Sequence, residues 1–271
     1  MAHSRSPQIH AAFAEQCGVQ LEYAKAEVAM GGFPQFVDQF VASGGRGLNI
    51  TLPFKTQAYK YVNSRDAFAQ AAGAVNTIKC QPDGMSQGFN TDGIGLVNDL
   101  QQRHGLDLTG KTILILGAGG ATQGVLQPLL KCAPKAVWVA NRTKSKAVSL
   151  VVRHADEFPL VTLSAMAFDK IPQVADVVVN ATSTGLQGGA LLIPAEFIRN
   201  AFCYDMSYGA AAHFQSWAAA NGAKKSVDGL GMLVEQAAES FLIWQGQRPM
   251  TDPVVAFLRE ELREDLRQTQ R

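Results

Sequence analysis

Residues 117–121, with the sequence Gly117-Ala-Gly-Gly-Ala121, have the composition of a turn that holds the phosphates of a nucleotide. They directly follow the apolar run Thr112–Leu116 and precede a helical pattern that extends to about Lys131. Glycines allow a tight turn and a close approach of the backbone to a pyrophosphate, and the next helix offers free N–H groups at its N-terminus. The spacing differs from G-x-G-x-x-G, so the strand–turn–helix context is what favours a dinucleotide site over a simple tight turn.

The end of the next apolar run, Ala136–Ala140, indicates which dinucleotide binds. It leads into Asn141-Arg142-Thr143, with Lys144 and Lys146 following, and this stretch contains no carboxylate. NAD enzymes usually place an acidic residue here to bind the ribose 2′-hydroxyl. A guanidinium instead suits the 2′-phosphate of NADP through forked, charge-assisted hydrogen bonds. The pattern predicts NADP as the cofactor, against the alternative of an ordinary solvated basic helix start.

Strand and helix patterns alternate through the middle of the chain. Besides 112–116 and 136–140, Asp176–Val179 and Phe202–Tyr204 are short apolar runs, and 144–155 has a helical pattern. Continuous apolar runs of this length are typical of strands buried on both faces of a parallel sheet. We therefore expect the α/β fold class, with a doubly wound NADP-binding domain of the Rossmann type over residues 92–227.

The rest of the chain predicts a second, mixed α/β domain over residues 1–91, completed by 228–271. Leu21–Val28 and Leu48–Leu52 are expected strands, and residues 33–41 carry an apolar helical stripe. Pro82-Asp-Gly84 predicts a hairpin turn between 75–79 and 85–89. Helical patterns recur after Leu230 and after Asp252, and we expect these C-terminal helices to return to the first domain or to a ligand cleft between the domains.

Composition restricts the class of protein further. Of 271 residues, 47% are hydrophobic and 17% are charged, which argues against disorder, and a net charge of +1 gives no reason to expect nucleic acid or an anionic membrane as a partner. No apolar run has the length of a membrane helix, and the N-terminus lacks the apolar core of a secretory signal. The spacing of the four cysteines and five histidines fits no metal site or disulfide framework. We expect a cytoplasmic protein without a metal, and both monomer and homodimer remain open.

Several polar clusters lie outside the nucleotide-binding pattern, and each alone has an ordinary explanation as a cap, a turn or a surface lysine. They are Ser4-Arg-Ser6-Pro7, Asn49-Ile-Thr51-Leu-Pro-Phe-Lys55, Gly73-Ala-Val-Asn76-Thr77, Asn90-Thr-Asp92-Gly93, and Asp228-Gly-Leu-Gly-Met232 with Gln236.

Taken in order, these clusters closely resemble the shikimate dehydrogenase family. The resemblance runs from Ala2 to about Leu262 and also includes the 117–121 loop, Asn141-Arg142-Thr143, Asn180-Ala-Thr-Ser183 and Asp205-Met-Ser-Tyr208. It implies NADP-dependent, reversible reduction of 3-dehydroshikimate to shikimate, in the pathway to chorismate and the aromatic amino acids.

The resemblance also implies roles for individual residues. Lys55 and Asp92 match the family's catalytic pair. Substrate-binding positions match Ser4, Ser6, Thr51, Lys55, Asn76, Asp92, Tyr208 and Gln236. Cofactor-binding positions match Gly117, Ala118, Gly119, Gly120, Ala121, Asn141, Arg142, Thr143, Lys146, Thr182, Met206 and Gly229. Lys146 stands where some members have a second arginine; it keeps the charge but loses the planar fork, so we expect somewhat lower affinity for the phosphate.

The N-terminus departs from the family pattern. Members usually begin with an apolar strand and a Gly-x-Pro turn about ten residues before Ala-His-Ser, whereas here Met1 directly precedes Ala2-His3-Ser4. A missing strand would remove ladder hydrogen bonds and core, and could misplace Ser4 and Ser6. Our hypothesis is that the native protein carries roughly a dozen more residues.

Two other functions fit the same residues. One is a quinate/shikimate dehydrogenase, although members that use NAD tend to have an acidic residue where Asn141-Arg142 stands. The other is a non-catalytic NADP-binding or regulatory paralogue, which the missing strand favours and the presence of both Lys55 and Asp92 opposes.

Overall fold

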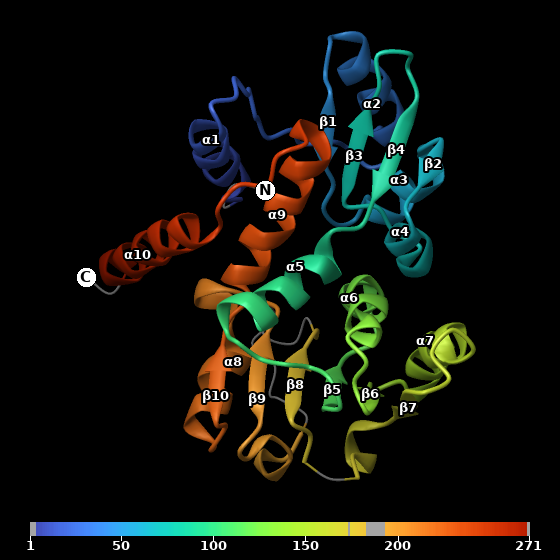
Figure 1. The fold of residues 1–271 in the computed structure, drawn as a ribbon, viewed down its shortest axis with the longest axis vertical. Coiled ribbons are helices and arrows are strands. Elements are labelled where there is room, and N and C mark those ends of the chain that lie inside the picture. Colours follow the sequence, from blue (N-terminus) through green and yellow to red (C-terminus); the bar gives the residue numbers. More distant parts are fainter. Residues whose placement is uncertain (1–3, 173, 183–192, 270–271) are drawn as a thin grey trace.

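The chain folds around two β-sheets, one in each of two lobes (Figure 1). The computed structural model describes residues 4–172, 174–182 and 193–269. Residues 1–3 and Ser183, which belong to two of the quoted motifs, lie outside the described residues.

The larger sheet is parallel throughout, as the apolar runs predicted. Its strands are β5 (Thr112–Leu116), β6 (Ala136–Ala140), β7 (Thr162–Met166), β8 (Val177–Asn180), β9 (Phe202–Asp205) and β10 (Lys225–Val227). Their order is β10-β9-β8-β5-β6-β7, the doubly wound arrangement in which the chain first moves to one side of β5 and then to the other.

Both faces of this sheet are covered, which explains why its central strands are apolar without alternation. In β5, Ile113 and Ile115 pack into the core formed with helices α6 (Gly120–Lys131) and α7 (Lys144–Ala155). Leu114 and Leu116 pack into the opposite core, which includes Phe214 of α8 (His213–Ala220). A strand with two buried faces has no polar side to present to water.

The smaller sheet contains four strands in the order β1-β3-β4-β2, namely β1 (Gly47–Asn49), β3 (Thr77–Cys80), β4 (Ser86–Phe89) and β2 (Ser64–Arg65). The β3–β4 hairpin is antiparallel, which confirms the predicted turn, and Gly84 adopts the φ of +84° that this turn requires. Three helices accompany this sheet: α2 (Phe33–Ala42), α3 (Lys55–Tyr61) and α4 (Ala67–Ala72).

One strand prediction in this lobe was wrong, and another was correct only at its start. Leu21–Val28 forms no strand, since no described strand pairs with it; the Tyr23 hydroxyl in this segment donates instead to Asn49 Oδ1 at 2.9 Å. The strand expected at Leu48–Leu52 ends at Asn49. Pro53 has no N–H to donate to a neighbouring strand, so the apolar residues before it do not extend the strand as far as the proline.

Four further helices join and flank the lobes. Helix α5 (Asp92–Asn98) continues into a π-helical turn, η1 (Asp99–Arg103), and lies with α9 (Leu230–Gln245) between the two sheets in Figure 1. Helices α1 (Ser6–Cys17) and α10 (Asp252–Thr269) share an apolar core with α9, so the C-terminal helices return to the N-terminal one, as expected. Short 3₁₀ turns occupy Phe168–Lys170, Ala195–Ile198 and Gly209–Ala211. None of the described helices has the length and apolarity required to cross a membrane.

The contact between η1 and α9 leaves no room for a side chain at Gly231. A Cβ atom there would lie 1.9 Å from Asp99 Oδ1. The Asp99 carboxylate cannot easily move away, because it is only 1% exposed and is held by two hydrogen bonds. It accepts one from Tyr204 Oη at 2.6 Å and one from Arg103 Nε at 2.8 Å.

We predict that Gly231→Ala lowers the free energy of unfolding by about 1–3 kcal/mol or more, the usual cost of overpacking a rigid site. Urea denaturation checks this. Gly32→Ala is the matched control, since the nearest atom to a Cβ at Gly32 is 3.4 Å away. Equal stability of the two variants would contradict the proposed rigidity of this contact.

Candidate functional site

Lys55 and Asp92 meet at the start of two helices. Lys55 is the first residue of α3 and Asp92 the first of α5, and Lys55 Nζ lies 2.6 Å from Asp92 Oδ2. Their side chains are 24% and 14% exposed, so the pair is partly shielded yet open to a small molecule. A shielded ammonium–carboxylate pair interacts more strongly than one in bulk water. The hydrogen bond from Lys55 Nζ to Asp92 Oδ2 fixes the direction of the lysine side chain.

Asn76 holds the other oxygen of the same carboxylate. Its Nδ2 donates to Asp92 Oδ1 at 2.8 Å, and it also lies 3.3 Å from Gln236 Oε1. The orientation of this amide is determined by the backbone, because the Thr91 N–H can only donate and lies 3.0 Å from Asn76 Oδ1. The structure thus brings four of the predicted site residues, Lys55, Asn76, Asp92 and Gln236, into one cluster.

A second layer of polar side chains, to which the sequence analysis assigned no role, supports Asn76. Thr77 Oγ1 lies 3.0 Å from Asn76 Oδ1 and 2.7 Å from Ser240 Oγ. Asn49 Nδ2 donates to Ser240 Oγ at 2.9 Å and to Thr77 Oγ1 at 3.1 Å. Ser240 follows Gln236 by four residues and so shares its helix face, which was the one signal available in the sequence.

The remaining predicted substrate residues are not hydrogen-bonded to the catalytic pair. Within the described residues, the side chains of Ser4, Ser6, Thr51 and Tyr208 make no hydrogen bond to Lys55 or Asp92. Ser4 Oγ lies 3.3 Å from Ser6 Oγ at the start of α1. Burial raises the pKa of Tyr208, and the charge of Arg5 opposes the shift, which places Tyr208 near the Ser4–Ser6 segment.

The predicted nucleotide residues follow the carboxyl ends of four neighbouring strands. Gly117 comes after β5, Asn141 after β6, Thr182 after β8 and Met206 after β9. Strands β6 and β7 are added on one side of β5, and β8, β9 and β10 on the other, so the strand order switches between β5 and β8. A Cβ at Gly117 would lie 3.0 Å from Ala181 O, just after β8. This is the switch point at which doubly wound sheets bind ligands.

The glycine turn at this edge has the space and the donors that a pyrophosphate needs. A Cβ at Gly119 or Gly120 would meet no atom within 4 Å, and no side chain caps the N-terminus of α6. Asn141 shapes the turn, because its Oδ1 accepts from Ala118 N at 3.2 Å and its Nδ2 donates to Thr143 O at 2.9 Å. The residues present therefore fit a dinucleotide.

The basic residues after β6 are available to a second phosphate. Arg142, Thr143 and Lys146 are exposed, and neither cation forms an ion pair with a described residue. Gly229 lies at the same edge, where a Cβ would be 2.5 Å from Met206 O, so only glycine fits there.

The two sites are adjacent. A Cβ at Gly124 of α6 would lie 3.3 Å from Asp92 Oδ2, so the helix whose N-terminus forms the glycine turn passes directly beside the Lys55–Asp92 pair. A dinucleotide turn next to a lysine–carboxylate pair between two lobes is typical of the class of two-lobed, nicotinamide-dependent oxidoreductases.

Comparison with known families makes the assignment specific. Three family models match: the shikimate dehydrogenase substrate binding domain at residues 1–78, shikimate / quinate 5-dehydrogenase at 99–187, and the shikimate 5′-dehydrogenase C-terminal domain at 229–256. The shikimate dehydrogenase (NADP(+)) of Alkalilimnicola ehrlichii is 51% identical over 96% of this chain and 95% of its own length. The chain belongs to the shikimate dehydrogenase family.

Solved structures agree with this membership and confirm the predicted fold class. An Ael1 enzyme from Pseudomonas putida has a TM-score of 0.88 at 39% identity, covering 95% of this chain and 94% of its own. A shikimate dehydrogenase solved in complex with NADP⁺ has a TM-score of 0.86 at 32% identity, covering 96% and 92%.

We predict that Thr77→Val lowers the free energy of unfolding by about 1–2 kcal/mol, because the buried hydroxyl bonds to Asn76, Ser240 and Asn49 are lost while the volume is kept. Denaturant titration measures this. Thr162→Val, at an exposed position of β7, is the control. A Thr77→Val protein as stable as the Thr162→Val protein would show that the second layer does not contribute to the free energy of unfolding.

Proposed function

We propose that this chain catalyses the NADP-dependent, reversible reduction of 3-dehydroshikimate to shikimate. The observation that carries the proposal is the Lys55–Asp92 pair, 2.6 Å apart and placed beside the helix that begins at the glycine turn. Membership of the shikimate dehydrogenase family supports the substrate, and the carboxylate-free segment after β6 supports NADP over NAD.

Lys55 is the proton donor in the reduction. NADPH, when bound, supplies the two-electron reducing equivalent to the C3 ketone. Negative charge then develops on the ketone oxygen, and the Lys55 ammonium stabilises this charge and donates a proton to it. Asp92, whose second oxygen is held by Asn76, accepts from the ammonium and orients it. In the oxidation of shikimate the pair accepts the hydroxyl proton.

The other polar residues are assigned to binding and orientation. Ser4 and Ser6, with Tyr208, hold the substrate carboxylate. Thr51, Asn76 and Gln236 bind the ring hydroxyls together with the catalytic pair. The position of Gln236 within 3.3 Å of Asn76 Nδ2 supports this, because both amides then face the same space as Asp92.

The proposed cofactor residues contact three parts of NADP. Residues 117–121 face the pyrophosphate, and the group Asn141, Arg142, Thr143 and Lys146 faces the 2′-phosphate of the adenosine ribose. Thr182, Met206 and Gly229 lie at the nicotinamide end. Thr182 is oriented by Asn180 Oδ1, which accepts from its hydroxyl at 2.7 Å and from its backbone N–H at 3.2 Å.

The proposal includes the organisation of the chain. Residues 1–91 with 228–271 form the substrate-binding catalytic domain, and 92–227 form the NADP domain. The cell compartment is the cytoplasm, which the four free cysteines support, and the active protein is a monomer or a homodimer.

The direct test is to purify the chain and follow NADP⁺ reduction with shikimate, with quinate and NAD⁺ as parallel controls. We expect turnover that depends on shikimate and NADP⁺ together. Turnover with quinate and NAD⁺ instead would contradict the proposed specificity. NADP⁺ binding with no turnover on either substrate would favour a non-catalytic role.

We predict that Lys55→Ala lowers turnover by about 10²–10⁴-fold, the usual contribution of a positioned proton donor, while NADP⁺ still binds. Steady-state rates and calorimetric titration with NADP⁺ measure the two effects separately. Lys60→Ala, an exposed lysine of the same helix, is the matched control. Near-normal turnover in Lys55→Ala would remove Lys55 from the mechanism.

We predict that Arg142→Gln weakens NADP⁺ binding by about tenfold or more and leaves NAD⁺ binding unchanged, because a charge-assisted pair to the 2′-phosphate is lost. Calorimetric titration with both cofactors checks this. Lys170→Gln serves as the control for loss of one surface charge, since Lys170 is 75% exposed. Equal weakening of both cofactors would place Arg142 away from the 2′-phosphate.

A further inference from the structure

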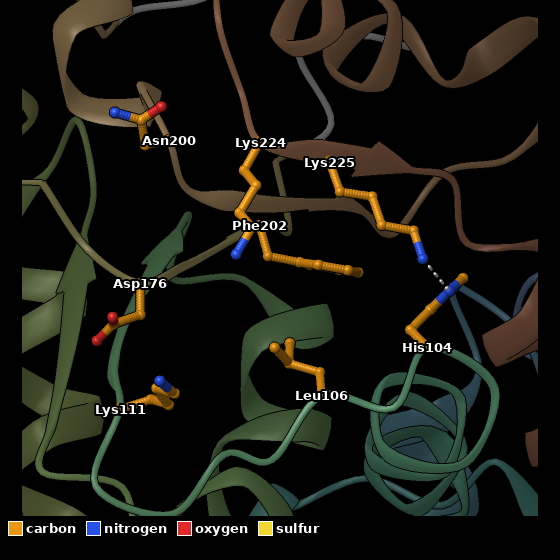
Figure 2. A pocket seen from close by; sticks show the side chains of 8 residues that line it. All are labelled: His104, Leu106, Lys111, Asp176, Asn200, Phe202, Lys224 and Lys225. Carbon is orange, nitrogen blue, oxygen red and sulfur yellow. Dashed lines mark hydrogen bonds between the residues drawn. The ribbon is translucent and has the colours of Figure 1, made fainter.

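A cavity lies at the opposite edge of the larger sheet, away from the cofactor turn. It has a volume of about 410 Å³ and is formed where strands begin: Lys111 precedes β5, Asp176 precedes β8, Phe202 opens β9 and Lys225 opens β10. Figure 2 shows the lining side chains, which are completed by His104, Leu106, Asn200 and Lys224. Neither the proposed substrate residues nor the proposed cofactor residues line this cavity.

Three ammonium groups line the cavity, and none of them forms a close ion pair with a described residue. They belong to Lys111, Lys224 and Lys225. The lining also holds one carboxylate, Asp176, whose Oδ2 accepts from the backbone N–H of Thr112 at 2.8 Å, so its lysines exceed its carboxylates by two. Like charges gathered around a concave surface repel one another and attract an anion.

His104 adds no positive charge to this group. Lys225 Nζ lies 3.3 Å from His104 Nδ1, and an ammonium can only donate, so Nδ1 is the acceptor and the ring proton is on Nε2, which faces Asp99 Oδ2 at 3.7 Å. Burial, with the charges of Lys225, Arg103 and Arg259, lowers the pKa of His104, and the charge of Asp99 opposes this shift. The imidazole is therefore neutral near pH 7 and acts as a dipole that holds Lys225 in place.

The cavity also has an apolar part. Leu106 and the ring of Phe202 lie between the basic side chains, with Phe202 and Lys224 entering from one side of the opening and Leu106 and Lys111 from the other (Figure 2). The Lys225 ammonium lies 5.6 Å from the centroid of the Phe202 ring. A concave surface with an apolar wall and charged groups around it is a form that small-molecule sites take.

We propose that this cavity binds a small organic anion, in which a phosphate or carboxylate group meets Lys224 and Lys225 and a planar apolar group lies against Phe202 and Leu106. The charge of the site selects the anion, and the apolar wall distinguishes it from inorganic phosphate. The proposal does not depend on the reaction catalysed at the other edge of the sheet.

The test uses phenyl phosphate as the probe, because it joins a dianion to a planar ring. Inorganic phosphate and benzyl alcohol each supply one half of it. Calorimetry on the full chain at constant ionic strength, with and without saturating NADP⁺ and shikimate, measures affinity. In parallel, NMR follows the imidazole signals of His104, which contacts Lys225, and of His154 on α7 as an internal reference.

We expect phenyl phosphate to bind more tightly than either half, to keep its affinity when NADP⁺ and shikimate are present, and to shift His104 alone. Lys224→Gln and Lys225→Gln should each weaken binding by about tenfold, whereas Lys170→Gln should not. Unchanged His104 signals, equal affinity for inorganic phosphate, or equal weakening by Lys170→Gln would overturn the proposal. The His104 readout needs no variant, so a substitution that harms folding cannot obscure the result.

Discussion

The arrangement of the whole site depends on the close approach of three helices at α5. A Cβ at Gly93 would lie 2.6 Å from Gly124 O of α6, and one at Gly95 would lie 2.8 Å from the backbone N of Gln236 in α9. Side chains at these two positions would push the helices apart. Because α5 begins with Asp92, its position between α6 and α9 places the carboxylate next to the nucleotide helix and next to Gln236 at once.

Hydrogen bonds around Asp92 then fix the orientations of the polar side chains in the site. Two unambiguous backbone donors act here: Thr91 N–H fixes Asn76 Oδ1 at 3.0 Å, and Asp92 N–H lies 3.2 Å from Asn90 Oδ1. Asn76 and Asn90 are 3% and 1% exposed, so neither amide can turn to water without losing its partners. The pair of Lys55 and Asp92 is therefore held by groups whose own directions are fixed, which is what a proton donor requires.

Much of this was accessible from the sequence, for identifiable reasons. The strands at 112–116 and 136–140 were predicted because burial on both faces leaves a continuous apolar run. β7 and β10 were missed, since Thr162–Met166 is half-exposed at the sheet edge and Lys225–Val227 has three residues, too short for a pattern. Lys55, Asp92, Asn76 and Gln236 came from ordered motifs. The contact of Thr77 with Ser240 joins residues 163 apart, and only tertiary packing brings them together.

The buried charges between α9 and η1 explain why Gln236 is held in place. Its neighbour Glu235 is 2% exposed and lies 3.1 Å from Arg103 of η1 and 2.7 Å from Arg248, while Arg103 also binds Asp99 and Asp252. Separating a buried carboxylate from its partners leaves an unpaired charge, at a cost of about 3–5 kcal/mol. Moving α9 along η1 would break two such contacts and press Gly231 against Asp99. Gly231 and Glu235 are four residues apart on the same face of α9, so the glycine contact and the ion network together hold that face against η1, and Gln236 stays within reach of Asn76.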